Sequence, residues 1–309
     1  MSAVIATEAL TKRYGDVVAV ERLSLRVEPG EIYGFLGVNG AGKSTTIRML
    51  LGMVEPSGGA VDLFGTRVRR GVGRVWERVG YLVEAPTAYP ELSVTENLEV
   101  VRRLRGIANP RSVARVVERL GLAPYAGRTA RSLSSGNLQR LGLAKALLAE
   151  PELLILDEPA NALDPAGVVE VRELLRELAE RRGVTVFMSS HVLGEVARLA
   201  TRVGVIHRGR LLEQLSADEL ARRQARRLIV DSRDRPAARQ VLTGAGFTLA
   251  RPAGNGALEL TDRRAVERPD EIARLLVGAG TPPITLKVEQ DDLETHFLRL
   301  VQAEEEARR

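Results

Sequence analysis

Residues 32–45 of this chain read IYGFLGVNGAGKST, and they decide its fold. The apolar run Ile32–Leu36 is typical of a short buried strand, and residues 46–54 have the apolar spacing of a helix. Between them, residues 37–44 match the pattern G-x-x-x-x-G-K-[S/T] in full. We call residues 37–44 the phosphate loop, because a strand on one side and a helix on the other are the context that such a loop requires.

The residue types in the phosphate loop suit a nucleotide. Glycines let backbone N–H groups turn toward a phosphate without a Cβ clash, and the following helix directs its positive end at the same anion. We expect Lys43 to reach the β- and γ-phosphates and the Ser44 hydroxyl to bind Mg²⁺. A glycine turn with a surface lysine is the structural alternative, and the flanking strand and helix argue against it.

A second acidic motif follows a buried strand further along the chain. Residues 153–158 read LLILDE, a continuous apolar run of the kind found in parallel sheets that are buried on both faces. Such a strand places Asp157 and Glu158 at its carboxyl end, where α/β sheets bind ligands. We expect Asp157 to be the carboxylate on the Mg²⁺ side and Glu158 to be the general base that orients water. Acids at strand ends can also simply solvate a loop, but the complete phosphate loop upstream favours the catalytic interpretation.

Strands and helices alternate through most of the chain, which predicts an α/β domain with a mostly parallel sheet. A change of composition near Ser216 then separates a smaller region whose pattern is β-α-β-β-α-β, the ferredoxin-like order. Either a dimer-stabilising appendage or a ligand-sensing module fits that region. Its expected strands are 227–231, 247–250, 256–260 and 284–289, its helices are 236–245 and 269–278, and further helices are expected at 217–227 and 291–305.

Composition excludes several classes of protein. The 309 residues contain no cysteine, which excludes a disulfide framework, thiolate zinc sites, Fe–S clusters and a cysteine nucleophile. No run of 18 apolar residues is present, and the amino-terminal residues lack an apolar signal segment, so we expect no membrane span. The net charge of +5 fits either a nucleic-acid surface or a solvated Arg/Glu exterior. Aromatic residues make up only 4% and do not interleave with basic clusters, which favours the solvated exterior.

Residues 132–140, SLSSGNLQR, begin an expected helix with small hydroxyl residues. Hydroxyls and free N–H groups at a helix start form a second anion site, although alone they would be an ordinary N-cap.

These motifs together resemble the ATP-binding subunit of an ABC transporter, over about residues 5–215. The phosphate loop is similar to the Walker A motif, residues 133–137 to the signature, residues 153–158 to Walker B and residues 161–164 to the D-loop. The resemblance implies a P-loop NTPase (ABC ATPase) domain at 1–218 with a helical subdomain at about 85–150, and a ferredoxin-like α+β accessory domain at 219–309. It implies catalytic Glu158 and His191; nucleotide-binding Tyr14 (stacked on adenine), Gly37, Asn39, Gly40, Ala41, Gly42, Lys43, Ser44, Thr45, Ser134, Ser135 and Gly136; and Mg²⁺-binding Ser44, Asp157 and Glu84.

Some positions depart from the family pattern. The signature is LSSGN where LSGGQ is usual, and Glu84 stands where the family has a glutamine. A carboxylate there can still bind Mg²⁺. A glutamate at this position makes the chain similar to the subgroup of ABC ATPases that serves bacitracin and lantibiotic resistance exporters. Residues 292–298, DLETHFL, are similar to the LEDxF ending of ATPases that serve drug exporters.

The resemblance also implies partners. Two chains would sandwich two ATP molecules, each signature facing the phosphate loop of the other chain, and residues 84–96 would dock on a separate membrane permease. The chain would then work at the inner face of the plasma membrane, for drug or antibiotic export, with no specific nucleic acid. A soluble ABC ATPase acting on ribosomes or DNA is the rival; such proteins carry two nucleotide domains or long coiled-coil insertions, and this sequence has a single phosphate loop.

Overall fold

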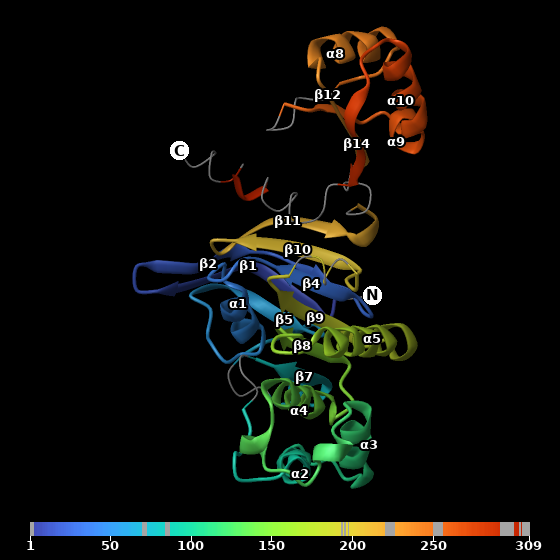
Figure 1. Cartoon of the computed structure of the whole chain (residues 1–309). Helices are drawn as coiled ribbons and strands as arrows, with labels where there is room; N and C mark the ends of the chain where they lie inside the picture. Colours follow the sequence, from blue (N-terminus) through green and yellow to red (C-terminus); the bar gives the residue numbers. More distant parts are fainter. Residues whose placement is uncertain are drawn as a thin grey trace. The chain divides into compact units, whose positions relative to one another are not determined.

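The structure is a computed structural model that describes residues 3–69, 73–83, 87–192, 194, 196, 198–219, 226–249, 256–290, 300–302 and 304. The chain divides into two compact units, Met1–Ala217 and Asp218–Arg309 (Figure 1). Among the described residues, no helix combines the length and the apolar character that crossing a membrane would require.

A six-stranded sheet forms the centre of the first unit, with the strand order β11-β10-β4-β9-β8-β7. All neighbouring pairs are parallel except β10 and β11. Every residue of β4, β8 and β9 is buried, as expected for strands covered on both faces. The strands are β4 (Ile32–Leu36), β7 (Val79–Leu82), β8 (Leu153–Asp157), β9 (Thr185–Ser190), β10 (Arg202–His207) and β11 (Arg210–Ser216).

A smaller antiparallel sheet comes mainly from the amino-terminal residues. Residues 23–27, LSLRV, alternate in sequence as a single strand would, but the structure interrupts them: β2 ends at Leu23 and β3 contains only Arg26 and Val27. Side chains take over the hydrogen bonds in between, because Leu25 N donates to Thr7 Oγ1, which itself donates to the Leu23 carbonyl. The strands are β1 (Ile5–Tyr14), β2 (Val17–Leu23), β3 (Arg26–Val27), β5 (Gly58–Leu63) and β6 (Thr66–Arg67).

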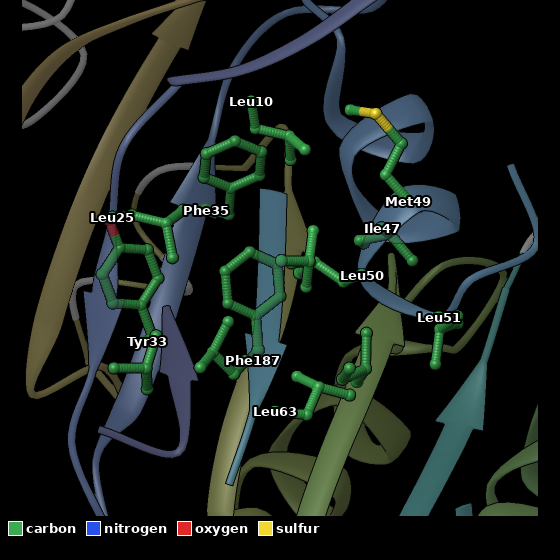
Figure 2. Packing of buried hydrophobic residues seen from close by; sticks show 14 of the residues in the cluster. Leu10, Leu25, Tyr33, Phe35, Ile47, Met49, Leu50, Leu51, Leu63 and Phe187 are labelled. Carbon is green, nitrogen blue, oxygen red and sulfur yellow. The ribbon is translucent and has the colours of Figure 1, made fainter. Parts of the chain in front are cut away.

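Helix α1 (Lys43–Leu50) packs with both sheets around a shared apolar core (Figure 2). The ring of Phe187 on β9 stacks on Tyr33 of β4, with centroids 5.4 Å apart, and Ile47 of α1 is fully buried in the same cluster. Burial of one such side chain contributes about 1.5–3 kcal/mol. The core therefore fixes α1 relative to β4, and with it the loop that joins them.

Four longer helices complete the first unit. The sequence Ala-Asn-Pro at 108–110 predicts a break in helical structure, and it separates α2 from α3. Helix α2 begins with a capping box between Ser93 and Glu96, and the hydrogen bonds from Ser93 lower the pKa of Glu96. The sequence also predicts a helix at 192–200; of that range the structure describes residues 192, 194, 196 and 198–200, and Gly194 and Val196 among them are helical. The four are α2 (Val94–Leu104), α3 (Arg111–Arg119), α4 (Ser135–Leu147) and α5 (Pro165–Arg182).

The second unit has an antiparallel sheet in the order β13-β12-β14 with its own apolar core. This is the ferredoxin-like order, with Leu249 making an isolated bridge to Leu260 where a strand was expected at 247–250. Helix α9 was not predicted, and the terminal helix expected at 291–305 lies mostly outside the described residues. The elements are β12 (Arg226–Ser232), α8 (Arg235–Gly244), β13 (Leu258–Leu260), α9 (Arg263–Glu267), α10 (Pro269–Gly278) and β14 (Pro283–Gln290).

Candidate functional site

Three of the predicted motifs meet at one edge of the central sheet. The strands β4, β8 and β9 are parallel neighbours, so their carboxyl ends lie together. In this register Leu36 pairs with Ser190, and Asp157 pairs with Ser189. The phosphate loop, the acidic pair and His191 therefore leave the sheet side by side, as the strand pattern predicts.

The backbone of the phosphate loop requires glycine at two positions. Gly42 is the N-cap of α1 with φ 108°, and a Cβ there would lie 2.6 Å from the carbonyl oxygen of Ala19. A Cβ on Gly37 would lie 2.6 Å from the carbonyl oxygen of Ile206. Both contacts are closer than carbon and oxygen normally approach, so a larger residue would displace the loop. The spaced glycines of the motif are thus explained by the neighbouring β2 and β10.

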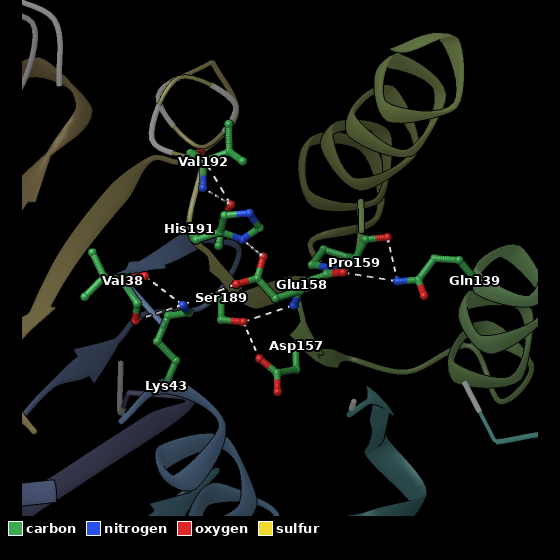
Figure 3. Close-up of polar contacts among 11 residues, drawn as sticks. Val38, Lys43, Gln139, Asp157, Glu158, Pro159, Ser189, His191 and Val192 are labelled. Carbon is green, nitrogen blue, oxygen red and sulfur yellow. Dashed lines mark hydrogen bonds and ion pairs between the residues drawn. The ribbon is translucent and has the colours of Figure 1, made fainter. Parts of the chain in front are cut away.

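Lys43 is buried inside this loop, with only 6% of its side chain exposed. Its Nζ donates a hydrogen bond to the carbonyl oxygen of Gly37 at 2.7 Å and lies 3.3 Å from Oε1 of Glu158 (Figure 3). A buried ammonium group is tolerated when it is paired in this way. The loop and the acidic pair are therefore joined through one cation.

Glu158 also contacts His191, the other residue that the sequence analysis predicts to be catalytic. Its Oε2 lies 2.8 Å from Nδ1 of His191 (Figure 3). Glu158 is 23% exposed and His191 is 48% exposed, so both can be reached from solvent. Lys43, Glu158 and His191 thus form one continuous polar chain, although they come from three separate elements.

Asp157 is held by a residue that the sequence analysis did not single out. Ser189 is fully buried in β9; its Oγ donates to Oδ1 of Asp157 and accepts from the backbone N–H of Glu158 at 3.0 Å. One hydroxyl thus fixes both members of the acidic pair. The only signal in the sequence was a serine pair that ends an otherwise apolar strand just before His191.

The backbone at Glu158 is strained. Its φ of 50° lies in the left-handed region, which costs a residue with a side chain about 1–3 kcal/mol. Its carbonyl oxygen accepts from the N–H of Asn161 at 3.0 Å and from Nε2 of Gln139 at 3.1 Å, in addition to the bond from its N–H to Ser189. Three bonds of about 0.5–1.5 kcal/mol each are enough to offset the strain. We call residues 157–163 the acidic turn.

A hollow of 450 Å³ opens over the phosphate loop. Arg208, which the sequence analysis did not predict, lies in the turn between β10 and β11 and is part of its wall. The predicted residues Asn39, Gly40, Ser44 and Thr45 line it too. The full lining is Val17, Val18, Ala19, Val38, Asn39, Gly40, Gly42, Lys43, Ser44, Thr45, Glu158 and Arg208.

Other predicted site residues do not line this hollow. Tyr14 stands at the end of β1, 47% exposed, with Nζ of Lys12 5.0 Å from its ring centroid. Ser134 and Ser135 are exposed at the start of α4, where the Ser134 side chain caps the helix by accepting from Asn137 N. Glu84 lies outside the described residues. Stacking by Tyr14 and metal binding by Glu84 therefore stay predictions.

The donor set at the sheet edge suits Mg²⁺. This ion is usually held by one or two protein oxygens and completes its shell with water and phosphate oxygens. Ser44 supplies a hydroxyl in the hollow, and Asp157 supplies a carboxylate that is 4% exposed at the end of β8. Within the described part of the chain, no cluster of three or more acidic or histidine side chains forms a complete metal cage. The residues present thus fit an ion that is shared with a phosphate substrate.

Side-chain hydrogen bonds hold the backbone of residues 87–92, which lie within the segment that the sequence analysis predicts to dock on a permease. We call residues 87–92 the docking loop after that prediction. Asn97, fully buried in α2, accepts from Tyr89 N at 2.8 Å and donates to the carbonyls of Tyr89 and Leu92. Lys145 of α4 donates to the Thr87 carbonyl at 2.8 Å, and burial lowers its pKa. The Tyr89 side chain is 56% exposed on this supported loop.

Comparisons with known proteins agree with this geometry. The model of the family described as ABC transporter matches residues 20–161. The chain is 38% identical to the bacitracin transport ATP-binding protein BcrA of Bacillus licheniformis, over 97% of this chain and 98% of that protein. It is 35% identical to the daunorubicin resistance ATP-binding protein DrrA3 of Streptomyces coeruleorubidus, over 96% and 95%. A solved dimeric ATP-binding cassette with ADP and phosphate bound has the same fold, with a TM-score of 0.65, 21% identity, and coverage of 69% of this chain and 98% of that one.

Proposed function

This chain belongs to the ATP-binding subunits of ABC transporters, the ATPases that drive a separate membrane permease, and we propose that it powers the export of an antibiotic or similar drug. The observation that carries the chemical part is the polar chain Lys43–Glu158–His191 beside the phosphate loop. The export part is supported by relatives named for bacitracin transport and daunorubicin resistance that match nearly the whole chain.

We assign the steps of ATP hydrolysis to these groups. Phosphoryl transfer to water needs mainly positioning and neutralisation of charge. Lys43 and the N–H groups of the phosphate loop bind the phosphates, and Glu158 accepts a proton from the attacking water. His191 orients Glu158 through Nδ1, and among the described contacts its Nε2 has no hydrogen-bond partner. With a proton on both ring nitrogens, His191 would donate from Nδ1 to Glu158 and from Nε2 to a phosphate oxygen. Ser44 and Asp157 would hold Mg²⁺, which supplies additional positive charge at the phosphates when bound.

We propose that the signature of one chain binds the nucleotide held by a second copy of the chain. Ser134 and Ser135 are exposed and do not line the hollow over their own phosphate loop. Free N–H groups at the start of α4 attract an anion. A two-fold pair of chains would bring each signature to the other chain's nucleotide, and the dimeric cassette with the same fold assembles as a pair.

The docking loop is the proposed contact with the permease. Its backbone is fixed by Asn97 and Lys145 while the Tyr89 side chain remains exposed, so it offers a rigid surface with an aromatic anchor. Bound there, the chain would work at the cytoplasmic face of the membrane with cytoplasmic ATP.

Glu158→Gln tests the catalytic assignment. The amide keeps the size of the side chain but cannot accept the proton, so kcat for ATP hydrolysis should fall about 10²–10⁴-fold. ATP binding, measured with a fluorescent nucleotide, should persist because Lys43 and the phosphate loop remain. An unchanged kcat would show that Glu158 is not the general base.

Co-purification tests the partner. The tagged chain, expressed in its native cell, should be recovered with a membrane protein, and Tyr89→Ala should reduce the recovery of that protein. Recovery with ribosomes or DNA at physiological salt, and with no membrane protein, would contradict the transporter assignment.

A further inference from the structure

We propose that Gln139 is a positioning residue for ATP hydrolysis, which holds the backbone of Glu158 and so ties the catalytic base to the helix that begins at the signature. The inference rests on the proposed role of Glu158 as general base. It adds a residue that acts through Glu158 and does not itself reach the nucleotide.

The contact is short and buried. Gln139 lies in α4, is 4% exposed, and its Nε2 donates to the carbonyl oxygens of Glu158 at 3.1 Å and Pro159 at 3.0 Å (Figure 3). Both hydrogens of the amide are therefore used on two successive carbonyls of the acidic turn. An amide is the natural group for this task, because it supplies two donors from one nitrogen without adding a charge.

One of the two carbonyl oxygens that accept from Gln139 belongs to Glu158, the residue with the strained backbone. Glu158 keeps its left-handed φ of 50° only while its surroundings determine it. Ser189 holds its N–H and Asn161 holds its carbonyl oxygen from within the turn. Of the described contacts to this backbone, the one from Gln139 alone comes from α4. Releasing it would let the carboxylate drift from its position, and small misplacements of a catalytic group are costly in rate.

Helix α4 meets the acidic turn at a second point near its start. A Cβ on Gly136 would lie 3.2 Å from the carbonyl oxygen of Ala162, so the first turn of the helix packs directly on the turn. The signature residue Ser135 begins α4, and Gln139 follows one helical turn later on the same rigid element. A shift of the signature when it engages a nucleotide would thus be passed by Gln139 to Glu158.

Gln139→Met is the direct test, because it removes both donors and nearly preserves the volume. We expect kcat to fall roughly 5–30-fold, as for the loss of one or two hydrogen bonds. The Kd for ATP should stay within about twofold, since the phosphate loop is untouched. Gln214→Met is the control: Gln214 lies on the edge strand β11, accepts a 2.9 Å hydrogen bond from buried Tyr33 and does not line the hollow, so the same substitution should leave kcat unchanged.

A double-mutant cycle separates positioning from general destabilisation. If Gln139 acts through Glu158, then Glu158→Gln with Gln139→Met should hydrolyse ATP no more slowly than Glu158→Gln alone. A further loss by the full factor, or a parallel loss of ATP binding in Gln139→Met, would overturn the inference. Gln139→Glu serves as a second isosteric variant should the methionine protein not fold, because it places an acceptor against two carbonyls; a wild-type kcat in the folded variant overturns the inference.

The outcomes also distinguish the inference from the proposed function. An inactive Glu158→Gln together with a wild-type kcat in Gln139→Met overturns the role of Gln139 alone. A wild-type kcat in Glu158→Gln overturns the general base, and with it the reason for Gln139.

Discussion

The phosphate loop and the acidic turn lie at the same sheet edge, yet they are held in different ways. The loop depends on what its own residues lack: Gly37 and Gly42 have no Cβ, so the backbone fits against its neighbours. The turn depends on what distant residues supply, because Ser189 and Gln139 bond the strained backbone of Glu158. A contiguous sequence motif can therefore specify a binding loop, whereas the position of a catalytic carboxylate depends on hydrogen bonds from elements that are distant in the sequence.

Of the substitutions that test this difference between the loop and the turn, Gly42→Ala should have the largest effect, a weaker binding of ATP. The new Cβ would strain a φ of 108° and press on the carbonyl oxygen of Ala19, so the loop would shift. We expect the Kd for ATP to rise roughly 10–100-fold, the equivalent of about 1.4–2.8 kcal/mol. Binding of a fluorescent ATP analogue measures it.

Gly30→Ala is the control for that substitution. Gly30 also has a positive φ, 76°, but a Cβ there meets nothing within 4 Å. It should lower stability slightly and leave the Kd for ATP unchanged. If Gly42→Ala bound ATP as tightly as Gly30→Ala does, the loop would not depend on the close approach to Ala19.

Ser189→Ala should produce a smaller effect, and on catalysis more than on binding. Loss of the hydroxyl leaves Oδ1 of Asp157 and the N–H of Glu158 without this partner, which we expect to lower kcat about tenfold, or about 1.4 kcal/mol in the barrier. The Kd for ATP should change little, because Ser189 does not line the hollow. Steady-state kinetics and nucleotide binding separate the two.

Ser232→Ala in the second unit is the matched control. Ser232 is also buried in a strand, where its hydroxyl donates to the Pro282 carbonyl at 3.2 Å. Both substitutions should lower the melting temperature, but only Ser189→Ala should lower kcat. Equal kcat values in the two variants would mean that the acidic turn keeps its geometry without Ser189.

The elements that the sequence predicted best are the ones with the strongest local signals. The apolar run of β4 and helix α10 have the expected bounds. Helix α5 matches the helix that the sequence predicts at about 165–182, between the cap residues Asp164 and Gly183. The sequence analysis predicted no strand at β5, β7, β10 or β11. Strands β5 and β11 are only partly buried and carry mixed residues, so periodicity gives little signal there. Strands β7 and β10 are mostly buried, but each is short and contains a glycine that interrupts its apolar run.

The residues of the candidate site likewise divide into those with a local sequence signal and those without one. Lys43, Asp157, Glu158 and His191 stand in motifs whose spacing follows from strand ends, and the structure brings them together. Gln139 had no such signal, since a glutamine inside an apolar helix can equally well face solvent.

The sequence by itself determined a phosphate loop, two acids at a strand end and a family of ATPases, because each follows from neighbouring residues or fixed spacing. Only the tertiary structure decided that Ser189 fixes the acidic pair, that Gln139 grips the carbonyl of Glu158, and that Arg208 borders the hollow. The physical reason is that these contacts join separate elements, and a hydrogen bond between distant residues depends on strand register and helix packing, which arise only when the core assembles.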